Sequence, residues 1–281
     1  MGRYVTTKKG QTFYIRDTPG DKGTIIGIHG LTGNHLQFHH YQEALSGTYR
    51  FISYDIRGRG NSDPAGANTS IFTHADDLLD LIDTLNIDKP IFMGYSMGAY
   101  IGSIAASRLS DVEALILLDG VGEADSVTRE LVLPSLNRLK KSYSFPEEYV
   151  KETRKLYTSL SIKWTNTMEE ILRYEIKRQG ASWEHKSDPS FLEQDFESFY
   201  AFDPENIFPS IDCNIFLLIA TGQLGHKRAL FQESSYTKTK GFLQESMIEY
   251  TPANHYELVF NQQPEISQQI QGFLSRKGVN T

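Results

Sequence analysis

The sequence lacks the features that mark several classes of protein. It has one cysteine, Cys213, so no disulfide can form within the chain, and this suits a reducing compartment. No apolar run approaches the roughly 20 residues of a membrane-spanning helix, and the first ten residues lack the apolar core of a secretion signal. A formal net charge of −7 argues against nucleic-acid and anionic-membrane partners. We therefore expect a cytoplasmic protein that spans no membrane and binds no nucleic acid.

Short apolar runs recur along the 281 residues and alternate with helical patterns. Near-continuous apolar runs of this length are typical of strands that are covered on both faces. Strands that alternate with helices indicate a mostly parallel sheet with right-handed crossovers. Residues 3–17 add two alternating runs around KKGQ, which predicts a hairpin. The other predicted strands are 24–30, 50–55, 90–94, 113–119, 215–220 and 246–250, and the clearest predicted helices are 74–85 and 97–109.

The alternation of predicted strands and helices stops between residues 121 and 209, where charged amphipathic segments carry many aromatic side chains. We interpret this segment as a helical insertion between the runs 113–119 and 215–220. A separate domain is the alternative, but the sheet-like portions on either side would then each be incomplete. We therefore expect residues 1–120 and 210–281 to form one core.

The stretch PIFMGYSMGAY (90–100) is the most informative part of the chain. A predicted strand enters Gly94-Tyr95-Ser96-Met97-Gly98 and a helix of small residues leaves it, so G-x-S-x-G stands in the strand–turn–helix context that the motif requires. The turn forces its serine into a strained backbone conformation and leaves no room for side chains two residues away. We therefore predict that Ser96 is a nucleophile. A glycine-rich turn with an incidental serine is the alternative.

A serine hydroxyl needs a base and a site for the oxyanion. His255, in TPANHYELV, is the one histidine downstream of the last predicted strand, so we expect it to be the base. One oxyanion donor should be the amide of Met97, which follows the nucleophile, and IHGLTGN (28–34) offers the amide of Leu31 as the second.

These motifs together resemble the α/β-hydrolase fold of the type with a helical cap. IHGLTGN resembles the oxyanion loop of that family, YDIRGRGNSD (54–63) its turn after the fourth strand, and NHYE its histidine loop. The resemblance implies an eight-stranded, mostly parallel α/β sheet flanked by helices, with residues 121–209 as a cap inserted after strand six. It implies no cofactor and no metal.

The sequence departs from the family where most members carry the acid of the triad. That position falls in the loop from Thr221 to His226, which holds neither Asp nor Glu. Asp119, at the end of the run 113–119, lies on a strand expected beside both the serine strand and the 215–220 strand, and some branches take their acid from there. We predict that Asp119 is the acid, with Asp125, Glu123 and Glu233 as reserves. A dyad without a carboxylate is the remaining alternative.

Two weaker signals have plainer interpretations. His35, His39 and His40 lie near Glu43 and could bind a metal, but the segment reads as an ordinary surface helix. Arg57 and Arg59 could cradle an anion, although the resemblance favours a structural turn.

We therefore predict a serine hydrolase that cleaves a small or medium carboxylic ester, lactone or thioester with an apolar body. Carbon–carbon bond hydrolysis or an aminopeptidase activity would use the same serine. A ligand receptor or regulatory protein with little turnover is the alternative from another class, and the acid-free loop at 221–226 motivates it. The sequence leaves the natural substrate and the oligomeric state open.

Overall fold

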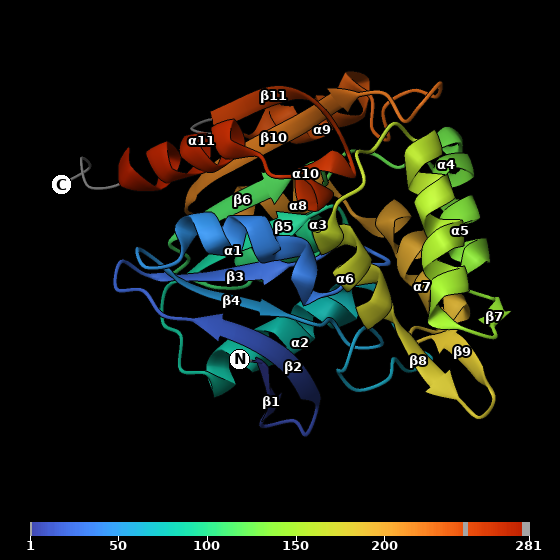
Figure 1. The fold of residues 1–281 in the computed structure, drawn as a ribbon. Helices are drawn as coiled ribbons and strands as arrows, with labels where there is room; N and C mark the ends of the chain where they lie inside the picture. The colour runs from blue at the N-terminus through green and yellow to red at the C-terminus, as the bar shows by residue number, and fades with distance from the viewer. Residues whose placement is uncertain (1, 244–246, 277–281) are drawn as a thin grey trace.

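An eight-stranded sheet runs through the core in the order β1-β2-β4-β3-β5-β6-β10-β11 (Figure 1). The computed structural model describes residues 2–243 and 247–276. β1 pairs antiparallel with β2, and β2 with β4, whereas the other neighbours pair in parallel. The predicted mostly parallel sheet is thus confirmed. Its strands are β1 Gly2–Thr6, β2 Thr12–Thr18, β3 Thr24–Ile28, β4 Arg50–Tyr54, β5 Pro90–Tyr95, β6 Ala114–Leu118, β10 Asn214–Gly222 and β11 Met247–Asn254.

Helices cover both faces of the sheet, which explains the near-continuous apolar runs. In β5, Phe92 joins a buried cluster with the helices α2 and α3, whereas Ile91 and Met93 join a second cluster with α1 and α11. Successive side chains of a strand point to opposite faces, so both must be apolar. The core helices and 3₁₀ segments are η1 His35–Phe38, α1 His39–Leu45, α2 Ile71–Thr84, α3 Met97–Ala106, η4 Glu233–Tyr236, α9 Thr237–Phe242, α10 Glu257–Phe260 and α11 Pro264–Ser275.

The segment between β6 and β10 lies beyond the carboxyl ends of β3, β4 and β6 (Figure 1). It contains the expected helices and also a small antiparallel sheet in the order β7-β9-β8, which the sequence analysis did not predict. Strands of two to four residues are too short to show a clear period in sequence. We refer to residues 121–209 as the cap. Its elements are α4 Ser126–Arg138, β7 Ser142–Tyr143, α5 Pro146–Ser159, α6 Asn166–Glu175, β8 Ile176–Gln179, β9 Ser182–His185, α7 Pro189–Glu197, η2 Ser198–Ala201, α8 Pro204–Ile207 and η3 Phe208–Ser210.

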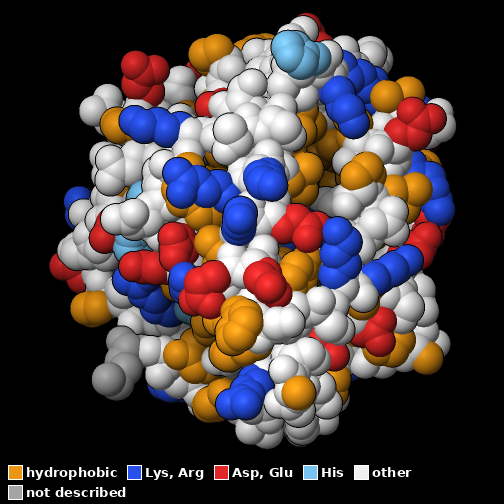
Figure 2. All heavy atoms as spheres, turned by 45° about the vertical axis from the view of Figure 1, so that its right-hand side comes forward, with side chains coloured by type: hydrophobic (Ala, Val, Ile, Leu, Met, Phe, Trp, Pro, Cys, Tyr) orange, Lys and Arg blue, Asp and Glu red, His pale blue; other side chains and the backbone are white. Residues whose placement is uncertain are grey.

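The surface on the cap side carries charges of both signs. Figure 2 shows basic and acidic side chains interspersed across this face, with apolar side chains between them. A mixed surface of this kind gives no strong field toward a polyanion. Within the described ranges, no helix combines the length and the apolar character that crossing a membrane requires.

Candidate active site

Ser96 occupies a strained turn between the end of β5 and the start of α3. Its φ of 54° and ψ of −118° lie in a region that residues with a side chain rarely adopt. The glycines two residues before and two residues after Ser96 make the turn possible. A Cβ on Gly98 would lie 1.8 Å from the carbonyl oxygen of Ile28, and a Cβ on Gly94 would lie 2.3 Å from the oxygen of Gly98. These contacts are the steric reason for the G-x-S-x-G spacing.

Asp119 and His255 form a buried pair. Asp119 directly follows β6 and His255 directly follows β11, and their side chains meet with His255 Nδ1 2.7 Å from Asp119 Oδ2. In the sheet, β10 lies between β6 and β11. The end of β6 is therefore only one strand away from the loop after β11, which carries His255. A proton on Nδ1 is donated to the carboxylate, and Nε2 is then the nitrogen left to accept a proton.

The carboxylate is held by two donors besides the histidine. The amide of Ala220 donates to Asp119 Oδ1 at 2.9 Å, and the Tyr236 hydroxyl donates to the same oxygen at 2.8 Å. Burial raises the pKa of Tyr236 well above its usual range, so its hydroxyl stays protonated and can donate. These bonds fix Asp119 with its second oxygen toward His255.

The sequence analysis did not single out two tyrosines that hold this pair. Tyr236 gave no signal in the sequence, since it meets Asp119 only through the fold. Tyr95 lies inside the G-x-S-x-G motif, so its position could have been used. Its hydroxyl donates to the carbonyl of His255 at 3.0 Å, and its ring lies 4.9 Å from the imidazole ring between centroids.

The reserve carboxylates lie elsewhere. All three are exposed, and none is hydrogen-bonded to His255 within the part of the chain that the structure describes. Each is paired with a cation: Asp125 with Arg228 at 2.7 Å, Glu123 with Lys238 at 2.6 Å and Glu233 with Lys240 at 3.2 Å. The loop from Thr221 to His226 supplies no acid. The chain that follows it instead brings apolar Leu230 and Phe231 to the site.

Ser96 and His255 line one small cavity of about 40 Å³ beneath the cap. Its wall also includes Phe196 and Phe199 of the cap and Leu31 of the core. Among the hydrogen bonds of the described residues, none joins Ser96 directly to His255. Such bonds are often long in ligand-free sites and tighten when substrate binds. The arrangement brings a hydroxyl, an imidazole and a carboxylate to one place.

Of the two predicted oxyanion donors, Leu31 lines this cavity, and Met97 directly follows the cavity residue Ser96 in the chain. Met97 opens α3, and a helix leaves the amides of its first turn without intrahelical acceptors. Leu31 lies in the loop after β3, where the Gln37 side chain accepts the amide of Gly30 at 3.1 Å. His29 braces the same loop, because its Nε2 accepts the amide of Ile56 at 3.0 Å and its Nδ1 donates to the carbonyl of Gly30 at 2.8 Å.

His29 should make the stability of the protein fall in acid. Burial lowers the pKa of His29 from 6.5 to about 3. Between these two pH values the imidazole is protonated in the unfolded chain and neutral in the folded chain. This site therefore contributes full stability above pH 6.5 and loses it as the pH falls toward 3. Urea unfolding should show the parent losing about 2 kcal/mol more than His29→Gln between pH 7 and pH 5. Equal losses in the two proteins would contradict this assignment.

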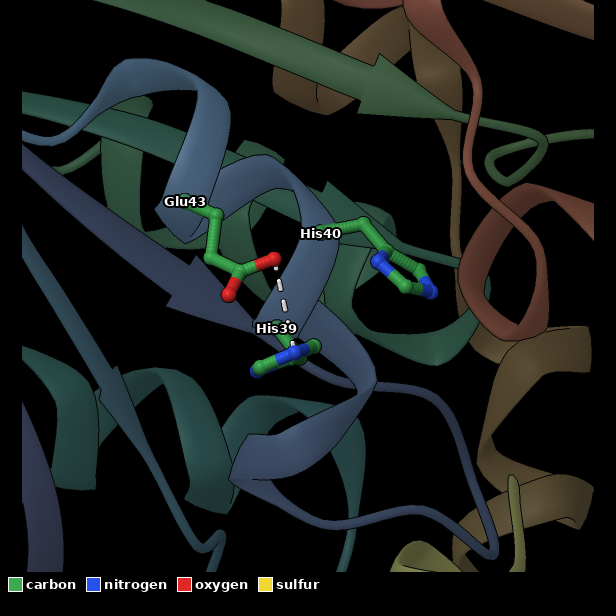
Figure 3. Close-up of side chains that lie close together, drawn as sticks. All are labelled: His39, His40 and Glu43. Atoms are coloured by element: carbon green, nitrogen blue, oxygen red, sulfur yellow. Dashed lines mark ion pairs between the residues drawn. The ribbon is translucent and has the colours of Figure 1, made fainter. Parts of the chain in front are cut away.

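One group of side chains among the described residues could share a metal ion. His39, His40 and Glu43 bring their ligand atoms within 4.8 Å of one another. Figure 3 marks an ion pair between His39 and Glu43, whose Nε2 and Oε2 atoms lie 3.4 Å apart. The ring of His40 lies 5.2 Å from that of His39 between centroids. The Arg16 guanidinium lies 3.3 Å from His39 Nδ1 and adds a positive charge beside the group. These residues do not line the cavity at Ser96, and we give them no part in its chemistry.

A serine on a strained strand–helix turn, beside a histidine paired with a carboxylate, is the arrangement of nucleophilic hydrolases. A family model described as the alpha/beta hydrolase fold matches residues 23–201. The chain belongs to this family.

Relatives and solved structures agree with this family. The chain is 35% identical over 127 residues to the AB hydrolase superfamily protein YisY of Bacillus subtilis, a match covering 44% of the chain and 47% of the relative. It is 32% identical over 113 residues to 3-oxoadipate enol-lactonase 1 of Acinetobacter baylyi, covering 38% of the chain and 42% of the relative. Each match thus spans less than half of the relative. The crystal structure of E-2-(acetamidomethylene)succinate hydrolase has a TM-score of 0.83 at 18% identity and covers 98% of this chain and 99% of that one, which shows a shared fold.

Proposed function

We propose that the protein is a serine hydrolase that cleaves a small or medium carboxylic ester, lactone or thioester. The observation that carries this proposal is the buried His255–Asp119 pair, whose histidine lines the same cavity as the strained Ser96. A relative named as an enol-lactonase supports an ester-like bond as the target.

The proposed reaction passes through an acyl-enzyme. Ser96 Oγ attacks the carbonyl carbon while His255 Nε2 takes its proton, and the amides of Leu31 and Met97 stabilise the oxyanion. His255 then protonates the leaving alcohol as the carbon–oxygen bond breaks. Water then attacks the acyl carbon while His255 takes its proton. The bond from that carbon to Ser96 Oγ breaks as His255 passes the proton to Oγ, and the acid is released. Asp119 keeps the imidazole oriented and stabilises its cation.

Residues 121–209 are proposed to act as the lid of this site. Phe196 and Phe199 of the cap close the cavity over Ser96, leaving about 40 Å³. Small-molecule pockets usually measure about 300–1,000 Å³, so the cap side chains must move to admit a substrate. Among the described residues that line the cavity, none is Asp, Glu, Lys or Arg, which favours an acyl group without charge.

A fluorophosphonate probe tests the proposal. We expect the parent protein to be labelled on Ser96 and to hydrolyse p-nitrophenyl esters, with acetate and butyrate turned over faster than dodecanoate because the cavity is small. Mass spectrometry of the labelled peptide and a panel of acyl-chain lengths provide the measurements. A protein that is neither labelled nor active, but whose melting temperature rises with ester ligands, would be a receptor instead.

A further inference from the structure

A buried ion pair joins the cap to the core beside the loop that carries Leu31. Arg59, in the turn after β4, places its Nη2 2.6 Å from Oδ2 of Asp195 on the cap helix α7. The Arg59 side chain is 1% exposed and that of Asp195 is 0% exposed. The two residues are 136 positions apart in the sequence, so only the docked cap brings them together.

The other contacts of Arg59 reach both proposed oxyanion residues. Its Nε donates to the carbonyl oxygen of Leu31 at 3.1 Å, and its Nη2 lies 3.9 Å from Sδ of Met97. Its Nη1 donates to the carbonyl of Arg57 at 3.0 Å, which fixes the planar guanidinium in its own turn. Because the donors of a guanidinium form a rigid fork, its orientation is passed to each group that it binds.

Asp195 also has hydrogen-bond partners besides Arg59. The Thr69 hydroxyl donates to Oδ1 at 2.6 Å, and His74 Nε2 lies 3.0 Å from Oδ2. Burial alone would raise the pKa of Asp195, but Arg59, His74 and Thr69 lower it below its usual range, so the carboxylate is charged. The next residue on α7, Phe196, lines the cavity at Ser96. One short piece of the cap thus contacts both the cavity and Arg59.

We propose that Asp195 and Arg59 are positioning residues through which the docked cap sets the oxyanion site. Asp195 orients Arg59, and Arg59 holds the Leu31 carbonyl, so that the Leu31 amide points into the cavity. The inference rests on the proposed function, since the amide matters only if an oxyanion forms there. It makes catalysis depend on cap docking: a displaced α7 would release Arg59 and with it the oxyanion loop.

Replacing Asp195 by asparagine removes the charge and keeps the shape. The change leaves the Arg59 cation buried without a counterion, so the guanidinium should shift and loosen its hold on Leu31. A displacement of about 1 Å at a catalytic group can cost about 100-fold in rate. We therefore expect Asp195→Asn to lower kcat for p-nitrophenyl acetate by about 100-fold, with KM changed less than about 3-fold. Inhibition by phenylboronic acid, which forms a tetrahedral anion on serine, should weaken in proportion.

Glu175→Gln is the matched control. Glu175 is also buried in the cap and lies 3.8 Å from a buried arginine, Arg138. Within the described residues, no hydrogen bond or ion pair joins it to the loop that carries Leu31. Removing the charge of Glu175 should lower the melting temperature. We expect kcat to stay within about 3-fold of the parent value once the active sites are counted by fluorophosphonate titration. Thr69→Val provides a milder second variant, since it removes one bond to Asp195 and keeps both charges; kcat should fall about 5-fold.

The outcomes separate the two proposals. If Asp195→Asn and Glu175→Gln lower kcat equally, or if Asp195→Asn raises KM and spares kcat, the positioning role is wrong and the hydrolase stands. If Asp195→Asn does not fold, an unchanged kcat in Thr69→Val overturns the inference and a reduced kcat supports it. A parent protein without turnover or labelling would overturn the proposed function and this inference together.

Discussion

Ser96→Ala should lower ester turnover by a factor on the order of 10⁶, which is close to complete loss. Without Oγ there is no atom to attack the carbonyl, and His255 has no hydroxyl to activate. Alanine keeps the Cβ, so the strained backbone at φ 54° should be retained along with the fold. Steady-state rates with p-nitrophenyl acetate measure the loss, and the melting temperature reports on folding.

Ser103→Ala is the control for the nucleophile. Ser103 lies on the same helix α3, is fully buried, and donates its hydroxyl to the carbonyl of Ala99 at 2.9 Å. Removing it should leave turnover within about 3-fold, because an intrahelical hydroxyl bond contributes only about 1 kcal/mol and no catalytic contact. Comparable activity in the Ser96 and Ser103 variants would refute the nucleophile assignment.

Asp119→Asn is expected to lower kcat by about 10⁴-fold. Two donors, the Ala220 amide and the Tyr236 hydroxyl, already point at Oδ1, so an asparagine must place its carbonyl oxygen there. Its NH₂ group then faces His255 and donates to Nδ1. This bond selects the tautomer with the proton on Nε2, which cannot take a proton from Ser96.

Glu233→Gln distinguishes Asp119 from the reserve acid on the loop beyond β10. Glu233 is exposed and is bound to Lys240 and to the Tyr250 hydroxyl, at 3.2 and 3.0 Å. We expect kcat of this variant to stay within about 3-fold of the parent. If the Glu233 change abolished turnover and the Asp119 change did not, the acid would have to be reassigned.

Local steric demands explain what the sequence predicted well. The turn at Ser96 tolerates only glycine at positions 94 and 98, so the motif is visible in five letters. The resemblance to the α/β-hydrolase fold predicted the strand order, and that order placed Asp119 near the histidine loop. A local turn with fixed steric demands can therefore be recognised from the spacing of its glycines.

Contacts between distant segments explain what the sequence did not reveal. Tyr236 meets Asp119 over 117 positions, and Asp195 meets Arg59 over 136. No periodicity connects such partners, and a lone tyrosine or aspartate in an amphipathic segment reads as an ordinary polar residue. The small sheet of the cap was missed for a different reason, because its strands are too short to show alternation.

Because the proposed acid, Asp119, directly follows β6, the loop that follows β10 need not supply one. Ser96 and Asp119 both lie within a single strand–helix–strand unit, residues 90–119, which carries two of the three proposed triad groups. Among the described residues, the stretch 223–231 makes no hydrogen bond to His255, and its Leu230 and Phe231 line the cavity. In the proposed hydrolase, substitutions at Leu230 and Phe231 should therefore alter the choice of acyl group and leave the His255–Asp119 pair in place.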